Sequence, residues 1–478
     1  MSHLSHQLPS KQRTILFLIA DTGAGHRSAA NAITNAINII SQHEQEEWHA
    51  RMAANPGDRA VDDALEPPTY RIEIVDVFAE YSRFPLREAV KLYGPTIRYN
   101  PKLFGEVFHK SNGPGTVLTV NSLATPLILN GLLRLFTTVQ PDIIVSIHPL
   151  VNFVTVRALR ELNINIPFMT VVTDLISVHY AWFSPGVDGY IVPTEQAKQI
   201  YLSRGLDATR VHVLGMPIDP KFTRPLASKE ELQRKFNLKP GLPTILLVGG
   251  GDGAGGLHAA VRAISKAHLP VQLLVVTGRN RRLYAQLQRS RSALRVPAQI
   301  FGFVNNMPEL MHAADVIVTK AGPGTICEAL SCKLPIVLSG YVPGQEEGNV
   351  EYVVKNHMGA LALDPRALID ILRRLIKPGS AELREWQQNA ERLSQPMASF
   401  EIARCIFQHM AAGGGQQAWH SKQWQKRRRL MSGRLRSAIR IRRFRTRPPK
   451  PSVKGPRMSR LARLGSRNLS DDRPERRD

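Results

Sequence analysis

The chain has 478 residues, which is long enough for two domains with separate hydrophobic cores. Its net charge of +24 is uneven, because residues 422–478 hold 21 Lys and Arg against 4 Asp and Glu and so carry +17 of it. Low apolar content and several prolines predict that this basic tail is disordered, and its charge predicts a polyanionic target. Cys327, Cys332 and Cys405 have no CxxC spacing or neighbouring histidine set, so neither a disulfide framework nor a zinc site is indicated.

Apolar runs such as residues 14–20 and 143–147 are strand-sized, well short of the roughly 20 residues that a helix needs to cross a bilayer. We therefore expect no membrane span. Residues 11–20 resemble a signal peptide, but a buried first strand that opens into a glycine turn explains them better. A cytoplasmic protein is expected.

Strand-sized apolar runs alternate with helical or loop stretches along the chain. They lie at residues 14–20, 71–77, 143–147, 168–173, 190–192 and 211–214 and, after a proline-rich, charged passage at 217–243, at 244–248, 271–276, 299–301, 316–319 and 336–339. This alternation predicts the α/β class, with two Rossmann-like doubly wound domains joined by a hinge. A last helix is expected at residues 381–412, ended by the glycines at 413–415.

Glycine turns after two strands of the second half are suited to bind a diphosphate through helix amides. Their candidate residues are Gly250, Gly251, Gly253, Gly322, Gly324 and Thr325. Arg279, after another strand, could face a phosphate, although a solvated helix start explains it nearly as well. The chain contains no Asp-x-Asp triplet, which argues against a paired-carboxylate magnesium site, so no metal and no other cofactor is expected.

Two polar side chains follow strands of the first half and are candidates for acid–base chemistry. His26 stands at the first strand-to-helix turn beside Gly25, where an imidazole is a suitable base near neutral pH; a helix cap or surface group is the alternative. Asp174 is a second candidate base, or the carboxylate that orients His26, with helix capping as its alternative. His148 and Trp182 could line the acceptor side of the same cleft.

Six ordered sequence blocks carry a resemblance to a known family. They are DTGAGHRSAANAI at 21–33, SIHPLVN at 146–152, TVVTDL at 170–175, LVGGGDGAGG at 247–256, GFVNNMPELMHAAD at 302–315, and TKAGPGTICEALSCKLPIVLSGYVPGQEEGN at 319–349. Together they resemble the family 28 glycosyltransferases, and within these the monogalactosyldiacylglycerol synthase group.

The resemblance implies the two-domain GT-B fold and a set of roles. It implies an acceptor domain at 1–216, a hinge at 217–243, a UDP-sugar domain at 244–380, a closing helix at 381–415 and the tail at 416–478. It favours His26 as the catalytic base and implies that Glu328 binds the ribose and Val304 the uracil. Gln345, Glu346 and Asn349 would then recognise the hexose and ribose region.

Residues 76–130 mix aromatic and basic side chains, which suits a surface at a membrane interface, with core packing under a loop as the alternative. The resemblance favours a membrane-facing acceptor site. We therefore expect an inverting UDP-hexose:diacylglycerol glycosyltransferase, with galactose favoured and glucose left open.

This enzyme would be peripheral on the inner face of the cell membrane, with diacylglycerol and anionic lipid as partners and no obligate nucleic acid partner; the sequence leaves its oligomeric state open. Related alternatives are an enzyme acting on a lipid-linked peptidoglycan precursor and a sugar-nucleotide epimerase. A polyanion-binding protein that uses the basic tail is the non-enzymatic alternative. A dinucleotide oxidoreductase ranks low, because the GxGxxG match at Gly251, Gly253 and Gly256 lacks the acidic residue after the next strand.

Overall fold

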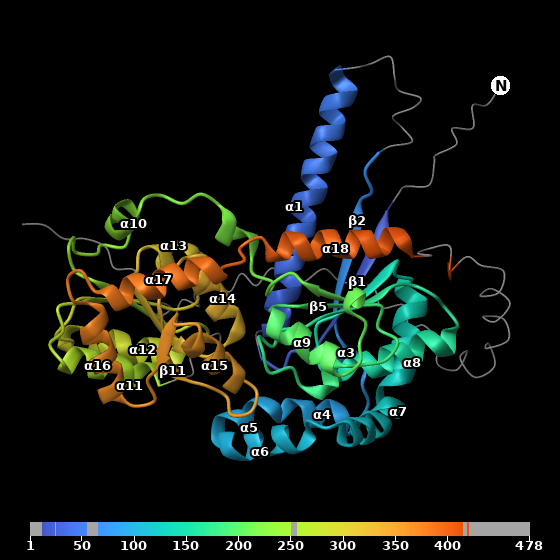
Figure 1. The fold of residues 1–478 in the computed structure, drawn as a ribbon, viewed down its shortest axis with the longest axis horizontal. Helices are drawn as coiled ribbons and strands as arrows, with labels where there is room; N and C mark the ends of the chain where they lie inside the picture. Colours follow the sequence, from blue (N-terminus) through green and yellow to red (C-terminus); the bar gives the residue numbers. More distant parts are fainter. Residues whose placement is uncertain (1–11, 24, 55–65, 250–255, 414–417, 420–478) are drawn as a thin grey trace, which may run out of the picture. The chain divides into compact units, whose positions relative to one another are not determined.

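The structure is a computed structural model that describes residues 12–23, 25–54, 66–249, 256–413 and 418–419. It contains two six-stranded sheets of parallel strands with helices packed on them (Figure 1). We call the first sheet with its helices the N-terminal lobe and the second the C-terminal lobe; both belong to one compact unit. The predicted α/β class with two doubly wound halves is confirmed.

The N-terminal sheet has the order β2-β1-β3-β4-β5-β6. Its strands are β1 (Arg13–Ile19), β2 (Tyr70–Asp76), β3 (Ile143–Ser146), β4 (Phe168–Val171), β5 (Gly189–Val192) and β6 (Val211–Val213). The central strands β3, β4 and β5 are buried along their whole length because helices cover both faces of a parallel sheet. The order reverses between β1 and β3, which leaves a crevice beyond the carboxyl ends of these two strands.

Helices of the N-terminal lobe connect these strands. They are α1 (Gly25–Ala54), α3 (Val77–Tyr81), α4 (Leu86–Lys91), α5 (Tyr93–Tyr99), α6 (Pro101–Ser111), α7 (Pro114–Val139), α8 (Asn152–Leu162) and α9 (Glu195–Ser203). Helices α4 to α6 are short and consecutive, and α6 packs against α7 (Figure 1).

The sequence predicted no segment long enough to cross a membrane, and helix α7 shows that this prediction is wrong. It has 26 residues and is the one described helix that is long and apolar enough to cross a membrane. Thr119, Ser122 and Thr125 divide its sequence into short apolar runs, but their hydroxyls donate to carbonyl oxygens one turn earlier, so the helix continues through them. Its later turns pack on α3 and α8.

The C-terminal sheet has the order β12-β11-β10-β7-β8-β9, which reverses between β7 and β10. Its strands are β7 (Thr244–Val248), β8 (Gln272–Val276), β9 (Ala298–Phe301), β10 (Val316–Lys320), β11 (Ile336–Gly340) and β12 (Gly359–Leu361). Sequence analysis missed β12, which is only three residues long and starts with glycine. A Cβ atom at Gly359 would lie 2.0 Å from the Ile336 carbonyl oxygen, so the close strand pairing requires glycine there.

The linker between the lobes holds η5 (Pro220–Thr223) and α10 (Lys229–Lys235), in agreement with the predicted break in the strand pattern at 217–243. The remaining helices are α11 (Leu257–Lys266), α12 (Arg281–Ser290), α13 (Met307–His312), α14 (Pro323–Ser331), α15 (Glu347–Lys355), α16 (Pro365–Leu375), α17 (Ala381–Leu393) and α18 (Ala398–Ala412).

The predicted single helix at 381–412 is wrong, because the chain breaks between α17 and α18 at the segment that contains Pro396. The break lets α17 pack on α14 and α16 of the C-terminal lobe, while α18 packs on α1 and β3 of the N-terminal lobe (Figure 1). Helix α18 ends before Gly413, as predicted. The tail was expected to start at residue 416, but the chain is still packed at Trp419. The buried indole of this residue donates to the Pro141 carbonyl oxygen at 2.9 Å.

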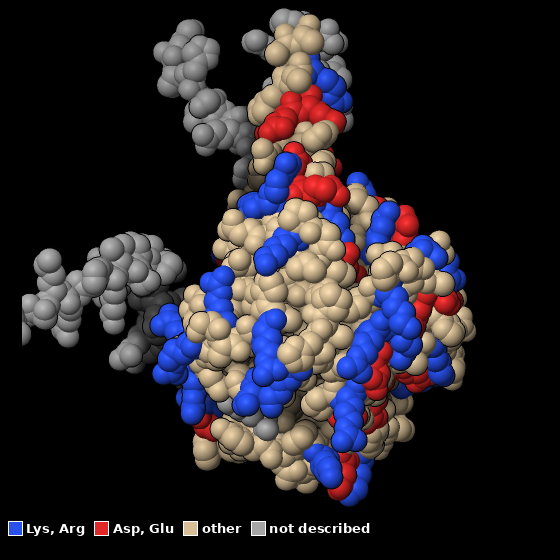
Figure 2. All heavy atoms as spheres, turned by 90° about the vertical axis from the view of Figure 1, so that its left-hand side faces the viewer, with Lys and Arg blue, Asp and Glu red and all other residues tan. Residues whose placement is uncertain are grey.

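Charged side chains do not gather into a single basic patch on the face shown in Figure 2, where Lys and Arg are spread out with Asp and Glu between them. Residues 1–421 carry +7 of the formal charge, since 422–478 carry the other +17. The most basic part of the chain therefore lies outside the described residues.

Candidate active site

The crevices at the two sheet reversals collect several of the residues that the sequence singled out. His26 and Gly25 follow β1, and His148 follows β3, so both sides of the first crevice carry a candidate. Gly322 and the start of α14 follow β10, on one side of the second crevice. Ligands of doubly wound sheets bind at such reversals. Gly250, Gly251 and Gly253, on the other side of the second crevice, lie outside the described residues.

His26, His148 and Trp182 form a ring cluster at the first crevice. The ring centroids of His26 and His148 are 4.8 Å apart in an edge-to-face arrangement, and those of His26 and Trp182 are 6.5 Å apart. His148 is buried and caps η2 (Pro149–Val151), accepting from the Leu150 amide at 3.3 Å, while Thr22 Oγ1 lies 3.4 Å from its Nε2. His26 is half-buried, with Thr173 Oγ1 3.5 Å from its Nδ1.

Both histidines are neutral at physiological pH. Burial lowers the pKa of His26 to about 4, against a smaller upward effect of its hydrogen bond to the Ile147 backbone. Burial, and then the neighbouring His26, lower the pKa of His148 well below its usual value. A neutral imidazole can accept a proton, so the first crevice holds a base ready to act.

Asp174 completes this cluster through Trp182. The Trp182 indole, in η3 (Tyr180–Trp182), donates to Asp174 Oδ2 at 2.7 Å. Burial raises the pKa of Asp174 to about 6, and the indole hydrogen bond only partly opposes this effect. Asp174 therefore binds the same indole ring that lies near His26, and its carboxyl group titrates close to neutral pH.

At the second crevice, Gly322 precedes α14, and Pro323 occupies its first position, where a missing N–H costs no helical hydrogen bond. The amides of Gly324 and Thr325 lie in the first turn, whose N–H groups have no partner within the helix. The α14 N-terminus therefore offers N–H groups and a positive dipole end to an anion.

Asn349 and Glu346 hold this turn in place. The buried Asn349 side chain donates to the Ala321 carbonyl oxygen at 2.8 Å. The buried Glu346 carboxylate accepts from Lys320 Nζ at 2.5 Å and from the Val342 amide at 2.9 Å. These bonds fix the turn and the loop after β11, and the predicted contacts of both residues with a sugar stay predictions.

Gln345 faces the N-terminal lobe. The Tyr93 hydroxyl of α5 donates to Gln345 Oε1 at 2.5 Å. Around this bond, His109 pairs with Glu347 at 3.2 Å, and a Cβ atom at Gly344 would lie 2.9 Å from the Phe108 ring. The loop at 341–347 is therefore packed directly against α5 and α6.

Glu328 lies on α14 and is half-buried. Burial raises its pKa to about 7, while Lys221 of η5 lowers it. Val304 packs at the edge of the C-terminal core. The exposed Arg279 guanidinium lies 5.6 Å from the Phe303 ring centroid, so its predicted phosphate contact stays untested.

Comparison with known proteins identifies the family. Residues 26–218 match the monogalactosyldiacylglycerol (MGDG) synthase model, and residues 244–402 match the glycosyltransferase family 28 C-terminal domain. The chain is 35% identical over 402 residues to a probable chloroplastic monogalactosyldiacylglycerol synthase of Glycine max, a match that covers 82% of this chain and 70% of that protein. It is 34% identical over 406 residues to the chloroplastic monogalactosyldiacylglycerol synthase 1 of Arabidopsis thaliana, with coverage of 82% and 70%.

The chain belongs to the monogalactosyldiacylglycerol synthase family. The predicted resemblance is thus confirmed, and the protein is an enzyme, a UDP-sugar glycosyltransferase. Its fold is GT-B: the solved structure of Acinetobacter baumannii MurG matches with a TM-score of 0.50 at 15% identity, over 83% of this chain and 99% of that chain.

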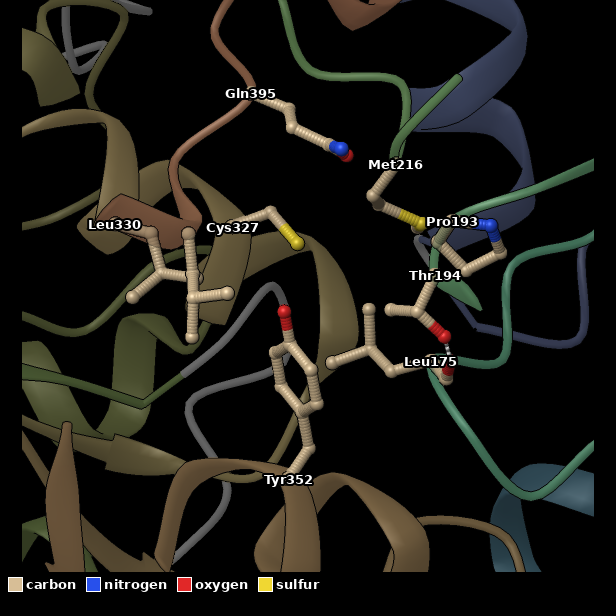
Figure 3. A pocket seen from close by; sticks show the side chains of 9 residues that line it. Leu175, Pro193, Thr194, Met216, Cys327, Leu330, Tyr352 and Gln395 are labelled. Atoms are coloured by element: carbon tan, nitrogen blue, oxygen red, sulfur yellow. Dashed lines mark hydrogen bonds between the residues drawn. The ribbon is translucent and has the colours of Figure 1, made fainter. Parts of the chain in front are cut away.

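In this member of the family, a small cavity lies between the lobes (Figure 3). Leu175, Thr194 and Met216 line it from the N-terminal lobe and the start of the linker, and Cys327 and Tyr352 from the C-terminal lobe. The Thr194 hydroxyl is used in a bond to the Leu175 carbonyl oxygen at 2.5 Å. The mostly apolar lining suits packing between the lobes and not the binding of a diphosphate.

Sequence reasoning missed two residues of the site. Lys320, the last residue of β10, has its Nζ atom 3.5 Å from the position of a Cβ at Gly322, so it places a cation beside the phosphate-sized turn. A lysine two residues before the glycine of such a turn could have predicted a cation at the phosphate site. Tyr93 carried no such signal, because its partner Gln345 is 252 positions away in the chain.

Proposed function

We propose that this protein transfers a hexose, by preference galactose, from a UDP-sugar to 1,2-diacylglycerol with inversion, and so forms a β-glycosyldiacylglycerol for membrane glycolipids. The galactosyl and diacylglycerol parts of this proposal are supported by the relatives, which are monogalactosyldiacylglycerol synthases. The observation that carries the proposal is the direct contact between the two halves of the site: Tyr93 of the N-terminal lobe binds Gln345 of the C-terminal lobe. Asp174 also lies close enough to raise the pKa of Tyr93, after the larger effect of burial.

The domain assignment follows from this arrangement. We assign acceptor binding to residues 1–216, the hinge to 217–243 and UDP-sugar binding to 244–380. The closing segment at 381–415 is two helices, and the second returns to the N-terminal lobe. The basic tail begins after Trp419, since that residue is still packed in the lobe.

In the reaction, the free hydroxyl oxygen of diacylglycerol attacks the anomeric carbon as the bond from that carbon to the UDP oxygen breaks. The hydroxyl proton passes to the neutral His26, and UDP leaves as an anion. His26 can accept this proton because its imidazole is unprotonated at physiological pH. We propose that Asp174, held in place by Trp182 near His26, favours the imidazolium that forms, together with Asp21, which raises the pKa of His26.

The C-terminal lobe stabilises the leaving diphosphate. The amides of Gly324 and Thr325, the α14 dipole and Lys320 provide positive charge where the negative charge develops. We propose that these groups act without a divalent cation. Glu328 would bind the ribose, Val304 the uracil and Gln345 the hexose, with Glu346 and Asn349 keeping the turn and loop in shape.

An apolar surface on the N-terminal lobe suits access to a lipid acceptor. The exposed large apolar side chains on and beside α4 to α7 are Phe84, Leu92, Tyr99, Leu103, Val107, Leu118, Val120 and Leu123. We call this set the apolar surface. The exposure of so many large apolar groups favours the membrane-interface interpretation of residues 76–130 over core packing. We propose peripheral binding at the inner face of the cell membrane, aided by attraction of the basic tail to anionic lipid.

The test uses the purified full chain, vesicles that contain diacylglycerol, and labelled UDP-galactose or UDP-glucose. We expect a labelled glycolipid, faster from UDP-galactose, with a β-anomeric proton coupling in its NMR spectrum. Activity should survive a chelator and be reduced by at least about 100-fold in His26→Ala. Release of free sugar or UDP without glycolipid would contradict the acceptor. Full turnover by His26→Ala would exclude the histidine as base, and a UDP complex with the nucleotide away from Gly322 would contradict the donor site.

A further inference from the structure

A group of metal-ligating side chains lies on the N-terminal lobe, apart from the two crevices. His212 is the middle residue of the edge strand β6, and Cys405 and His409 lie one turn apart on α18. One ligand atom from each of the three lies within 4.8 Å of the others. Sequence analysis did not pair Cys405 with a histidine, although His409 follows it by four residues, the spacing that puts two side chains on one face of a helix.

His212 supplies the independent evidence for a ligand here. Its Nε2 atom is buried and has no hydrogen-bond partner among the described residues. A buried imidazole nitrogen without a partner is costly, and such atoms are rare in native proteins unless a ligand or water completes them. Its ring and that of His409 meet edge to face with centroids 5.4 Å apart.

The other two residues are oriented as ligands. His409 Nδ1 lies 2.9 Å from the backbone oxygen of Cys405. A hydrogen bond donated there leaves the lone pair on Nε2, as in many metal-binding histidines. Space is available beside this nitrogen because the neighbouring residue on β5 is Gly189, whose Cβ atom would lie 3.1 Å from it. Cys405 Sγ lies 3.7 Å from His409 Nδ1.

Two imidazoles and a thiolate are the donor set of a borderline metal ion such as Zn²⁺, and not of Mg²⁺ or Ca²⁺, which prefer oxygen. Bonds of about 2.0 to 2.3 Å place tetrahedral ligand atoms roughly 3.5 Å apart. The ligand atoms now lie within 4.8 Å of one another, so the side chains would rotate to bring them to that value. We propose that His212, Cys405 and His409 bind Zn²⁺, with water as a fourth ligand.

The ion would have a structural role. Helix α18 follows α17, which packs on the C-terminal lobe, and α18 itself packs on the N-terminal lobe. A bond between β6 and α18 would therefore fasten the returning helix to the sheet edge. Burial raises the pKa of the Cys405 thiol to about 11, so binding releases a proton from it, while the nearby Lys198 opposes a cation.

The test adds Co²⁺ alone to the metal-free full chain. We expect one equivalent to produce a thiolate-to-cobalt charge-transfer band together with the visible bands of tetrahedral Co²⁺. Both should disappear in Cys405→Ser and persist in Cys332→Ser, a matched control because Cys332 lies half-buried in the C-terminal lobe. His212→Gln should weaken binding at least 10-fold.

A second measurement covers the case in which Cys405→Ser folds poorly. Zn²⁺ should raise the Tm of the wild type and of Cys332→Ser by a few degrees and raise the Tm of His212→Gln by clearly less. The proposal is overturned if the wild type gives no thiolate band, or if the band persists in Cys405→Ser. An equal rise in Tm for His212→Gln would also overturn it. None of these outcomes depends on glycosyltransfer.

Discussion

The pH dependence of catalysis depends on Asp174 and His26. Their pKa values of about 6 and about 4 are both set mainly by burial, and both groups act in the deprotonated form. Activity should therefore reach its plateau above about pH 7 and fall in two steps as the pH is lowered, first as Asp174 gains a proton and then as His26 does. The measurement is the pH profile of kcat/KM. Asp174→Asn should lower the plateau and remove the upper step; an unchanged step near 6 would show that another group causes it.

Lys320 has a double role, since it faces the Gly322 turn and neutralises the buried Glu346. Lys320→Met should lower kcat/KM for the UDP-sugar by about 10- to 100-fold and the free energy of unfolding by about 1–3 kcal/mol, because a carboxylate is left without its partner. Kinetics and urea unfolding measure the two effects. Lys333→Met is the matched control, since its ion pair with Glu391 is exposed and contributes little. Loss of stability with normal kinetics would leave Lys320 a structural role only.

The strands and turns could be predicted from sequence, because a parallel strand covered on both faces needs a continuous apolar run and a following turn needs glycine. This placed His26, His148 and Gly322 at the sheet reversals. The other features of the site depend on contacts between residues that are far apart in the sequence. The Tyr93–Gln345 bond has no local pattern, and Glu346 and Asn349 gave no sign that their polar groups bind the turn. The break before α18 could have been predicted from Pro396, which lies between the two helices.

Contact between α5 and the loop at 341–347 makes Tyr93 a positioning residue for donor binding. Tyr93→Phe keeps the packed ring and removes one hydrogen bond to Gln345, a loss of about 1 kcal/mol. We expect KM for the UDP-sugar to rise about fivefold with little change in kcat or Tm. Tyr284→Phe is the control, because its hydroxyl makes only an exposed contact with Gln288 on α12. A drop in Tm without a change in KM would assign Tyr93 to stability alone.

The apolar surface of α4 to α7 should determine how the enzyme reaches its acceptor. Leu123, on α7, is 72% exposed, so Leu123→Asp should leave Tm unchanged. It should weaken vesicle binding by about 10-fold or more, because the membrane loses the transfer free energy of one leucine side chain. Activity on vesicles should fall accordingly, whereas activity on a soluble short-chain diacylglycerol should not. Leu363→Asp, in the C-terminal lobe at 61% exposure, is the control. Equal effects of the two variants would contradict a specific membrane face.

At the scale of the whole molecule, apolar contact and charge are divided between different parts of the chain. The described lobes carry the apolar surface, whereas residues 422–478 carry +17. Each cation near an anionic bilayer contributes about 1 kcal/mol, so even partial engagement of these residues would exceed the contribution of a single exposed leucine. This attraction is screened by salt over about 10 Å at 0.1 M.

Removal of the basic residues should therefore change membrane binding without changing the fold. The truncation should end at Ser421, because Trp419 is buried and bonded to Pro141. Flotation with vesicles containing anionic lipid should show strong, salt-sensitive binding for the full chain. The truncated chain should show weak, salt-insensitive binding and keep its activity on soluble diacylglycerol. With purely zwitterionic vesicles the two chains should bind alike, since only the apolar surface acts. Equal flotation with anionic vesicles at low salt would exclude the tail as a membrane element and point to another polyanion as its target.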